Sequence, residues 1–385
     1  MPYADLLHLA ALAMAGSCPK TVLEKSFTKF SDWENLFYAS WYEGLLPYIY
    51  HSILKKKINI PDHLADFSNT VYRKHIIQHK ILSAEIIRIS MIFRAAEIKY
   101  AWIKGPVLAS LFYSSPELRP SNDIDLLIKE IDLKNALKVL GKAGYLPFYT
   151  LTDSQQKIFN KYNKHTFLMQ QKNKAVLELH TAVAAWEYFF RYPAQNIVDS
   201  SITVSFYNEK VSAPRAEDSL LISAIHGAMH AWDKIIWICD SAAIIKKIKN
   251  PDWNRIFNSV KNLPETKNAL ELCLALASGI FRSNLPEQAQ KSVAANSSLK
   301  NPVRRITERI ARPGRRFNLK NRAKIYTALE PGAPGKILFF LRWMITPCIH
   351  DIETVSAGPF FFWIYSIIRI FRLTRLNMGK LLKKN

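Results

Sequence analysis

The chain has 385 residues, and 49% of them are apolar, so it can bury a sizeable core spread over two or three structural units. Lysine and arginine total 53 against 31 aspartates and glutamates, a formal net charge of +22 that favours anionic partners such as nucleotides, nucleic acid or acidic membranes. This composition excludes a disordered chain. The longest apolar run near the C-terminus, residues 359–368, covers only half of the roughly 20 residues that a membrane-spanning helix needs.

The cysteines and the N-terminus are typical of a cytoplasmic protein. Cys18, Cys239, Cys273 and Cys348 are widely separated and form no Cys-x-x-Cys pair, so reduced thiols are expected. The first eight residues carry Asp5 and lack the basic start of a secretory signal peptide. We therefore expect a cytoplasmic location, with contact to a membrane surface as the alternative considered below.

In chain order, residues 1–95 repeat apolar positions at helical spacing and predict a helical N-terminal region. Residues 96–212 alternate between strand and helix patterns and predict a mixed domain, which contains the candidate catalytic residues described below. Two apolar runs around Lys172–Lys174 predict a β-hairpin within this domain. The other elements expected there are strands at 100–103 and 124–128 and helices at 107–113 and 133–143.

Carboxylates mark two of the predicted strands. Asp123 and Asp125 are separated by one apolar residue and therefore share one face of a strand, and Glu178 and His180 share a face of a later strand. The first strand is otherwise apolar, and a buried unpaired carboxylate is costly, so the pair needs cations or hydrogen-bond donors. An Asp-x-Asp pair by itself also occurs where an exposed strand ends or a helix begins. Three carboxylates on neighbouring strands, however, can hold two Mg²⁺ or Mn²⁺ ions.

Lys104 and Gly105 stand between a predicted strand and a predicted short helix, where a helix N-terminus can meet phosphate. Glycine at this position permits a close approach of the backbone to a ligand. Two interpretations of Lys104 remain open, because a lysine at the end of a strand either contacts phosphate or is solvated.

Several segments together resemble a known family. They are Ile103-Lys104-Gly105, Leu118 through Ile128, Leu177 through His180, Asp32 through Pro47, His226 through Asp240, and Thr346 through Arg369. In these segments the chain resembles the bacterial group known as uncharacterised nucleotidyltransferases, within the DNA polymerase β-like nucleotidyltransferase superfamily. The resemblance implies an α+β fold with a small mixed sheet and flanking helices, a helical N-terminal cap and a helical C-terminal domain.

The resemblance also implies an activity, the transfer of a nucleoside monophosphate from an NTP such as ATP to an acceptor, with release of pyrophosphate. Asp123, Asp125 and Glu178 would be the catalytic metal ligands, and Glu178 would help to deprotonate the acceptor. Lys104 and Arg119 would neutralise the triphosphate, although Arg119 could instead pair with Asp123 or Asp125.

His180 would orient Glu178 or contact substrate, unless it is an ordinary core histidine. The wider superfamily has a Gly-Ser pair where this chain has Lys104-Gly105-Pro106, and the proline removes one backbone donor from the expected phosphate site.

Residues 213–282 predict a helical domain beside the substrate cleft. A continuous helix is expected over 217–249, with a polar stripe on one face formed by His226, His230, Asp233, Trp237 and Asp240. Three interpretations of the stripe stay open. The histidines could chelate zinc, although no third ligand is evident; the stripe could be a hydrogen-bonded or solvated face; or it could line the cleft opposite the carboxylates, which would make His226 and Asp240 substrate-binding residues.

The remaining sequence predicts a basic, loop-rich segment at 283–335 and C-terminal helices at 336–385. The positive charge concentrates at 300–324, where a short basic helix is possible at 303–311. The last helix carries Arg369, Arg372 and Arg375 on one side, and either docks on the protein or lies on a membrane surface.

The sequence does not identify the acceptor, which could be tRNA, a peptide, a sugar or a small metabolite, and it does not give the oligomeric state. Transfer of a different phosphoryl group is possible on the same fold. The alternative function is a non-catalytic nucleic-acid or membrane-surface binding protein that uses the 300–324 segment and the last helix. The three intact carboxylates favour the enzyme.

Overall fold

The computed structural model describes residues 2–16, 19–27, 30–186, 188, 190–248, 251–312, 314–355, 357, 361 and 363–381, with side chains up to residue 375. Cys18 therefore lies outside the described residues, as does the start of the apolar run expected at 359–368.

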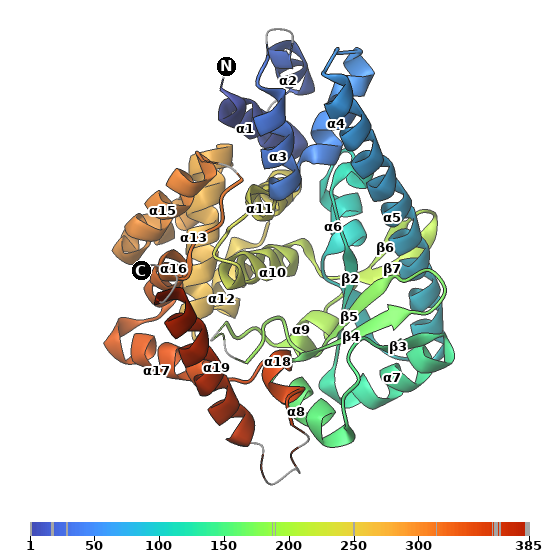
Figure 1. Cartoon of the computed structure of the whole chain (residues 1–385), viewed down its shortest axis with the longest axis vertical. Helices are drawn as coiled ribbons and strands as arrows, with labels where there is room; N and C mark the ends of the chain where they lie inside the picture. Colours follow the sequence, from blue (N-terminus) through green and yellow to red (C-terminus); the bar gives the residue numbers. More distant parts are fainter. Residues whose placement is uncertain are drawn as a thin grey trace.

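The N-terminal region is helical, and its helices lie at the top and right of Figure 1. Its helices are α1 (Tyr3–Met14), α2 (Lys20–Ser26), α3 (Trp33–Glu43), α4 (Leu46–Lys56) and α5 (Asp62–Ala95). Helix α3 ends where Gly44 adopts a left-handed φ of 78°, the conformation that favours glycine after a helix. Buried leucines and aromatic rings of α1, α3 and α4 join the large helical core of the molecule.

A five-stranded mixed sheet stands beside these helices in the order β1-β2-β5-β4-β3. Strand β2 runs parallel to β5 and places Asp125 opposite Glu178, whereas the other pairings in this sheet are antiparallel. Strands β4 and β5 form the hairpin expected around Lys172–Lys174. The strands are β1 (Tyr100–Trp102), β2 (Asp123–Ile128), β3 (Tyr145–Pro147), β4 (His165–Gln170) and β5 (Val176–His180).

The long helix α5 covers one face of the sheet, where Ile86 and Ile89 belong to the same buried cluster as Leu126 and Leu177. Because side chains alternate along a strand, this packing turns Asp125 and Glu178 to the opposite face. Further elements complete the domain: α6 (Gly105–Phe112), α7 (Leu133–Lys142), α8 (Asp153–Asn163), α9 (Ala194–Asp199), and a separate hairpin of β6 (Ile202–Phe206) and β7 (Glu209–Ala213).

The continuous helix expected over 217–249 is interrupted. Helix α10 (Ala216–Met229) ends and α11 (Ile235–Lys247) begins after a corner in which Ala231 and Trp232 take left-handed φ values of 53° and 47°. Trp232 is fully buried at this corner. The polar stripe is therefore not a single helix face, because its residues are divided between two helices and the corner that joins them.

The rest of the helical half of the molecule follows α11. Its first two helices are α12 (Trp253–Ser259) and α13 (Pro264–Phe281), and α13 packs on both α10 and α11. The segment expected to be loop-rich is instead mostly helical, with α14 (Glu287–Ala295), α15 (Lys300–Ile310) and α16 (Leu319–Leu329). Buried Ile306, Ile325 and Leu329 explain the difference, because these few apolar residues suffice to pack α15 and α16 on the core.

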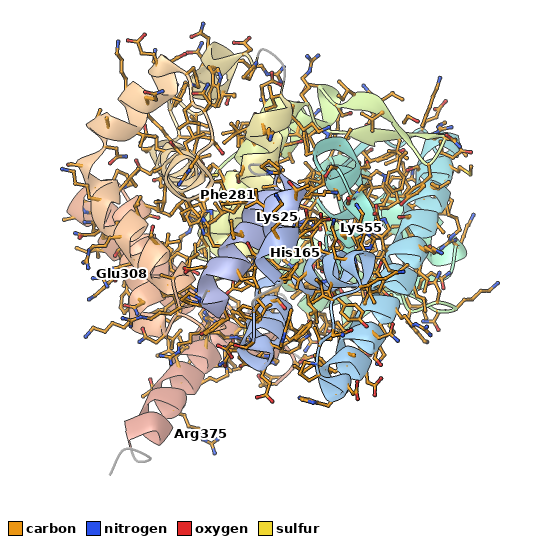
Figure 2. The ribbon with its side chains drawn as sticks, turned by 90° about the horizontal axis from the view of Figure 1, so that it is seen from above. Lys25, Lys55, His165, Phe281, Glu308 and Arg375 are labelled. Carbon is orange, nitrogen blue, oxygen red and sulfur yellow. The ribbon has the colours of Figure 1, made fainter. Side chains whose placement is uncertain are left out.

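Three C-terminal helices complete the described chain: α17 (Gly332–Ile345), α18 (Ile349–Ile352) and α19 (Trp363–Leu381). Helix α19 is docked, because Tyr365 is fully buried and Arg372 Nε lies 2.6 Å from Asp351 Oδ1. Figure 2 shows the far part of α19 extending away from the body, with Arg375 on it. None of the helices in the described ranges combines the length and hydrophobicity of a membrane span. The fold class is α+β, as the sequence predicts.

Candidate active site

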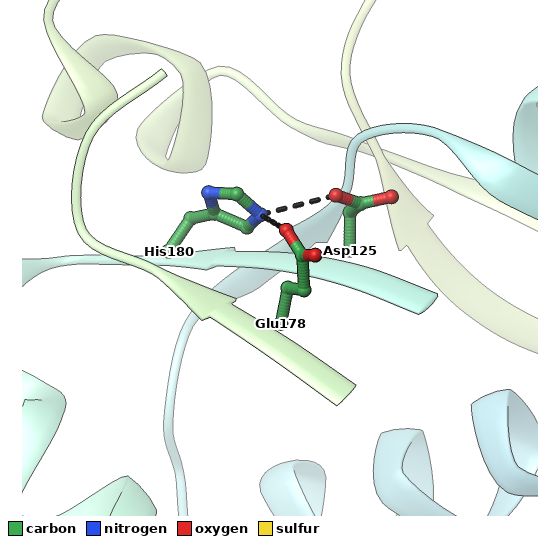
Figure 3. Close-up of side chains that lie close together, drawn as sticks. All are labelled: Asp125, Glu178 and His180. Atoms are coloured by element: carbon green, nitrogen blue, oxygen red, sulfur yellow. Dashed lines mark hydrogen bonds and ion pairs between the residues drawn. The ribbon is translucent and has the colours of Figure 1, made fainter. Parts of the chain in front are cut away.

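The parallel pairing of β2 with β5 brings two of the predicted carboxylates together. Asp125 of β2 and Glu178 of β5 are register partners, and His180 lies two residues further along β5 on the same face. His180 Nε2 lies 3.0 Å from Asp125 Oδ1 and 3.3 Å from Glu178 Oε2, so one ring nitrogen links both carboxylates (Figure 3). One ligand atom from each of these three residues lies within 4.8 Å of the others, which makes them a candidate metal group.

Lys104 lies against this group. It follows β1 and is the N-cap residue of α6, and its Nζ is 2.6 Å from Asp125 Oδ1. The same Nζ is 3.4 Å from His226 Nδ1 of α10, so Lys104 spans the space between the sheet and the helical half. Gly105 follows with a φ of +65°, a left-handed conformation that glycine adopts without strain, and this turn starts α6.

Charges within the group stabilise one another. Burial opposes ionisation of Asp125, but Lys104 and His180 outweigh burial and hold the pKa of its carboxyl well below the usual range. Burial also opposes the charged form of His180, yet its bonds to Asp125 and Glu178 raise its pKa. Burial opposes ionisation of Glu178 too, but the bond from His180 and the charges of His180 and Lys104 together lower its pKa.

Asp123 is the carboxylate without a compensating bond. It is half-buried at the start of β2, and burial together with the charges of Asp125 and Glu178 raises its pKa to about 7. Its carboxylate does not belong to the close group of three ligand atoms. The structure thus places Asp123 beside the group of Asp125, Glu178 and His180 in the same pocket, and its role as a metal ligand stays a prediction.

These residues line one pocket of about 460 Å³ between the sheet and the α10–α11 corner. His226, His230 and Trp237 line its helical side, and the rings of His230 and Trp237 stack with centroids 4.7 Å apart. Burial lowers the pKa of His226 well below its ordinary value and that of His230 to about 4, so both histidines are neutral near pH 7. Part of the predicted stripe therefore faces the carboxylates.

The remaining stripe residues serve the packing of the protein. Asp240 is held by Arg119, with Nη2 at 2.6 Å from Oδ2, and by the Tyr113 hydroxyl at 2.6 Å, and it does not line the pocket described here. Arg119 lines the pocket edge, but its guanidinium pairs with Asp240 and not with Asp123 or Asp125. Asp233 is buried at the corner and pairs with Arg322 at 2.6 Å.

The pocket also contains residues that the sequence pattern did not single out. Ser121 and Asn122 directly precede Asp123, so their place next to the Asp-x-Asp motif could have identified them from the sequence. His165 lies on β4, where its ring centroid is 5.2 Å from that of His180. Lys234, the N-cap residue of α11, enters the pocket only because the chain turns at the corner. The positions of His165 and Lys234 depend on strand pairing and on the corner, so no local pattern marks them.

The donor set fits a divalent metal ion. Its carboxylate oxygens suit Mg²⁺ or Mn²⁺, whereas the His180 nitrogen faces Asp125 and Glu178 and holds these carboxylates in place. The Lys104 ammonium already supplies one positive charge at Asp125 Oδ1. No group of three ligating residues is found around His226 and His230 in the described part of the chain, which leaves the zinc interpretation of the stripe without support.

Carboxylates on adjacent parallel strands, beside a lysine and a glycine that starts a helix, are an arrangement suited to transferring phosphoryl groups, and nucleotidyltransferases are a class with this chemistry. The sequence profile of the family described as Uncharacterised nucleotidyltransferase matches residues 30–282, which cover both the sheet and the α10–α11 corner. The chain belongs to this family, as the sequence motifs predict.

Two other comparisons add little. No curated protein matches the chain. Among solved structures, it is similar to the crystal structure of an antigenic nucleotidyltransferase-like protein from Paracoccidioides brasiliensis, at 14% identity and a TM-score of 0.33, over 54% of this chain and 95% of the other.

Proposed function

We propose that the protein transfers a nucleoside monophosphate from an NTP to an acceptor hydroxyl or phosphate and releases pyrophosphate. The acceptor oxygen forms a bond to the α-phosphorus as the bond from that phosphorus to the bridging oxygen breaks, and a hydroxyl acceptor gives its proton to a carboxylate. The single observation that carries the proposal is the pairing of Asp125 with Glu178 across parallel strands, with Asp123 at the start of the same strand, in one pocket.

Asp125 and Glu178, with Asp123 beside them, would hold Mg²⁺ or Mn²⁺. When bound, such ions neutralise the charge that develops on the phosphoryl oxygens. His180 donates to Glu178 or Asp125 and fixes the orientation of both carboxylates. Glu178 is the group that we assign to deprotonating the acceptor, because it is ionised and lies at the pocket surface.

Lys104 and the start of α6 would bind the triphosphate. The ammonium group is a point charge suited to phosphate oxygens, and it belongs to the N-cap residue of α6, the end of a helix that favours an anion, although Pro106 supplies no N–H there. Arg119 supports this side of the pocket only indirectly, because its guanidinium forms an ion pair with Asp240.

The test is transfer of a labelled nucleoside monophosphate from each of the four NTPs, with Mg²⁺ or Mn²⁺, into components of a cell lysate. Asp125→Asn should lower incorporation at least about a hundredfold, because it removes a ligand charge at nearly constant volume. The loss of its buried ion pair with Lys104 should lower the Tm as well, so a cooperative unfolding transition well above the assay temperature is the check that the variant is folded. The matched control is Asp199→Asn, which removes a carboxylate paired with Lys129 outside the pocket and should leave incorporation unchanged. Wild-type incorporation by Asp125→Asn would overturn the proposal.

A further inference from the structure

A second groove opens beside the carboxylate pocket. The two share Gly44, Pro120, Ser121, Asn122 and Lys234 in their walls, so they are continuous along the segment that leads into β2. The groove has a volume of about 830 Å³, larger than the carboxylate pocket itself. A ligand lying in the groove would reach Asp123 and Asp125 with one end.

The groove is basic. Lys74 of α5, Lys234 of the corner and Arg316 of the α15–α16 loop line it, and its walls carry no carboxylate. Within the described ranges, none of these three side chains forms an ion pair with a carboxylate. Their positive charge is therefore available to an anionic ligand.

Exposed rings accompany these cations. Trp41 lines the groove with 56% of its surface exposed, and Tyr38, one turn earlier on α3, is 60% exposed. Tyr42 forms the floor, where Lys234 Nζ lies 5.5 Å and the Arg316 guanidinium 5.7 Å from its ring centroid. An exposed tryptophan beside cations that form no ion pair with a carboxylate suits a ligand that combines planar rings with phosphates.

A buried ion-pair network holds the basic loop in this place. Arg309 pairs with Glu43 at 2.7 Å and Arg322 pairs with Asp233 at 2.6 Å. Two backbone N–H groups of the loop, those of Gly314 and Phe317, donate to the carboxylates of Glu43 and Asp233. These bonds hold the loop between α3 and the α10–α11 corner, where the Arg316 side chain lines the groove.

From this geometry we infer that the groove binds a single-stranded nucleic acid, and that its terminal hydroxyl or phosphate is the acceptor in the carboxylate pocket. This inference rests on the proposed function and names its substrate class. Each nucleotide unit carries one phosphate for the cations and one planar base for the exposed rings, whereas an acidic peptide would use the charges and leave Trp41 without a partner.

Binding is measured without catalysis, by fluorescence anisotropy of labelled single-stranded RNA and DNA of about ten nucleotides on the full chain. With three phosphates contacted at roughly −0.7 each, the plot of log K against log salt should have a slope of about −2. Lys74→Gln with Arg316→Gln should reduce the slope to about −0.7. Trp41→Ala should weaken binding about fivefold to 150-fold at constant salt, because one stacked base is lost.

Matched controls lie on other faces of the molecule. Lys134→Gln with Lys138→Gln removes two exposed charges of α7, and Trp363→Ala removes a half-exposed tryptophan of α19; both should bind as the wild type does. The RNA and DNA probes show whether the sugar hydroxyl contributes. The inference is overturned by an absence of binding, by equal losses in the controls, or by equally tight binding of duplex DNA or of poly-glutamate.

Incorporation of labelled nucleoside monophosphate separates this inference from the proposed function. If the bound oligonucleotide becomes labelled and a blocked terminus prevents the labelling, both proposals are supported. If a different acceptor in a lysate is labelled in an Asp125-dependent way while the oligonucleotides do not bind, the inference fails and the proposed function stands.

Discussion

The side chain of Lys104 connects the chemistry of the site to its stability. Its Nζ lies 2.6 Å from Asp125 Oδ1 and its pKa is raised, because the carboxylates of Asp125 and Glu178 outweigh the effect of burial. The lysine therefore occupies, as a permanent cation, an oxygen that a divalent ion would also use. This position gives the residue two opposing effects, since it competes with a metal ion but attracts the triphosphate.

We predict that Lys104→Met binds Mn²⁺ more tightly than the wild type in the absence of nucleotide, by about tenfold, and binds NTP more weakly. Tenfold corresponds to about 1.4 kcal/mol, well inside the ~4 kcal/mol of two unit charges about 4 Å apart near a protein surface. Manganese electron paramagnetic resonance measures the first effect and titration calorimetry the second.

Lys129→Met is the matched control for this change, because Lys129 also pairs with an aspartate, Asp199, but outside the pocket. Its Mn²⁺ and NTP affinities should equal those of the wild type. If Lys104→Met loses Mn²⁺ affinity instead, the lysine supports the metal site rather than competing with it.

At the scale of elements, the sequence predicts the sheet better than the helices. Alternation along β2 and β5 and the hairpin marked by Lys172–Lys174 are local signals, and they indicate that the carboxylates share a face and that β4 pairs with β5. The register that places Asp125 opposite Glu178 comes from the parallel pairing of β2 with β5. The corner between α10 and α11 has no such signal. Residues 217–247 are compatible with one helix, yet the chain turns at the point where Trp232 is buried in the tertiary structure.

Long-range pairing explains the contacts that no local pattern could indicate. Arg119 and Asp240 are 121 positions apart, and nothing in the sequence near either residue indicates that they form a buried ion pair. The same reason explains why the sequence indicated only a possible short helix in the basic segment at 300–324, because Glu43 and Asp233, which bind this segment, lie far away in the chain.

The corner yields a prediction at Gly227 of α10. A Cβ atom at this position would lie 2.2 Å from Nε1 of Trp232, which is fully buried and has no room to move. Gly227→Ala should therefore destabilise the protein by about 1–3 kcal/mol, the usual cost of overpacking. It should also shift His226 and His230, and thereby weaken NTP binding.

Urea unfolding and calorimetry measure the two effects. Gly141→Ala is the matched control, because a Cβ atom added to this helical glycine of α7 would meet no atom within 4 Å and alanine is the better helix former. A Gly227→Ala variant as stable as the wild type would mean that the corner repacks freely.

At the scale of the whole molecule, one buried carboxyl group makes the folded protein less stable as the pH rises. Glu330 follows α16, is only 4% exposed, and its Oε2 lacks a hydrogen-bond partner among the described residues. Burial, and then the charge of Glu265, raise the pKa of Glu330 to about 8 from an ordinary value of 4.5. The protonated acid is thus the native form at neutral pH.

The sign of the pH dependence follows from this shift. Between pH 4.5 and pH 8 the unfolded chain has lost the Glu330 proton while the folded chain keeps it, so this group makes the protein less stable as the pH rises through that window. Glu330→Gln cannot ionise and should have nearly the wild-type Tm at pH 5 but a higher Tm at pH 8, by about 4 °C. Glu265→Gln, the neighbouring carboxylate, should show a smaller gain. Thermal unfolding from about pH 5 to pH 8.5 compares the three proteins, and parallel curves for wild type and Glu330→Gln would show that Glu330 is ionised in the folded state.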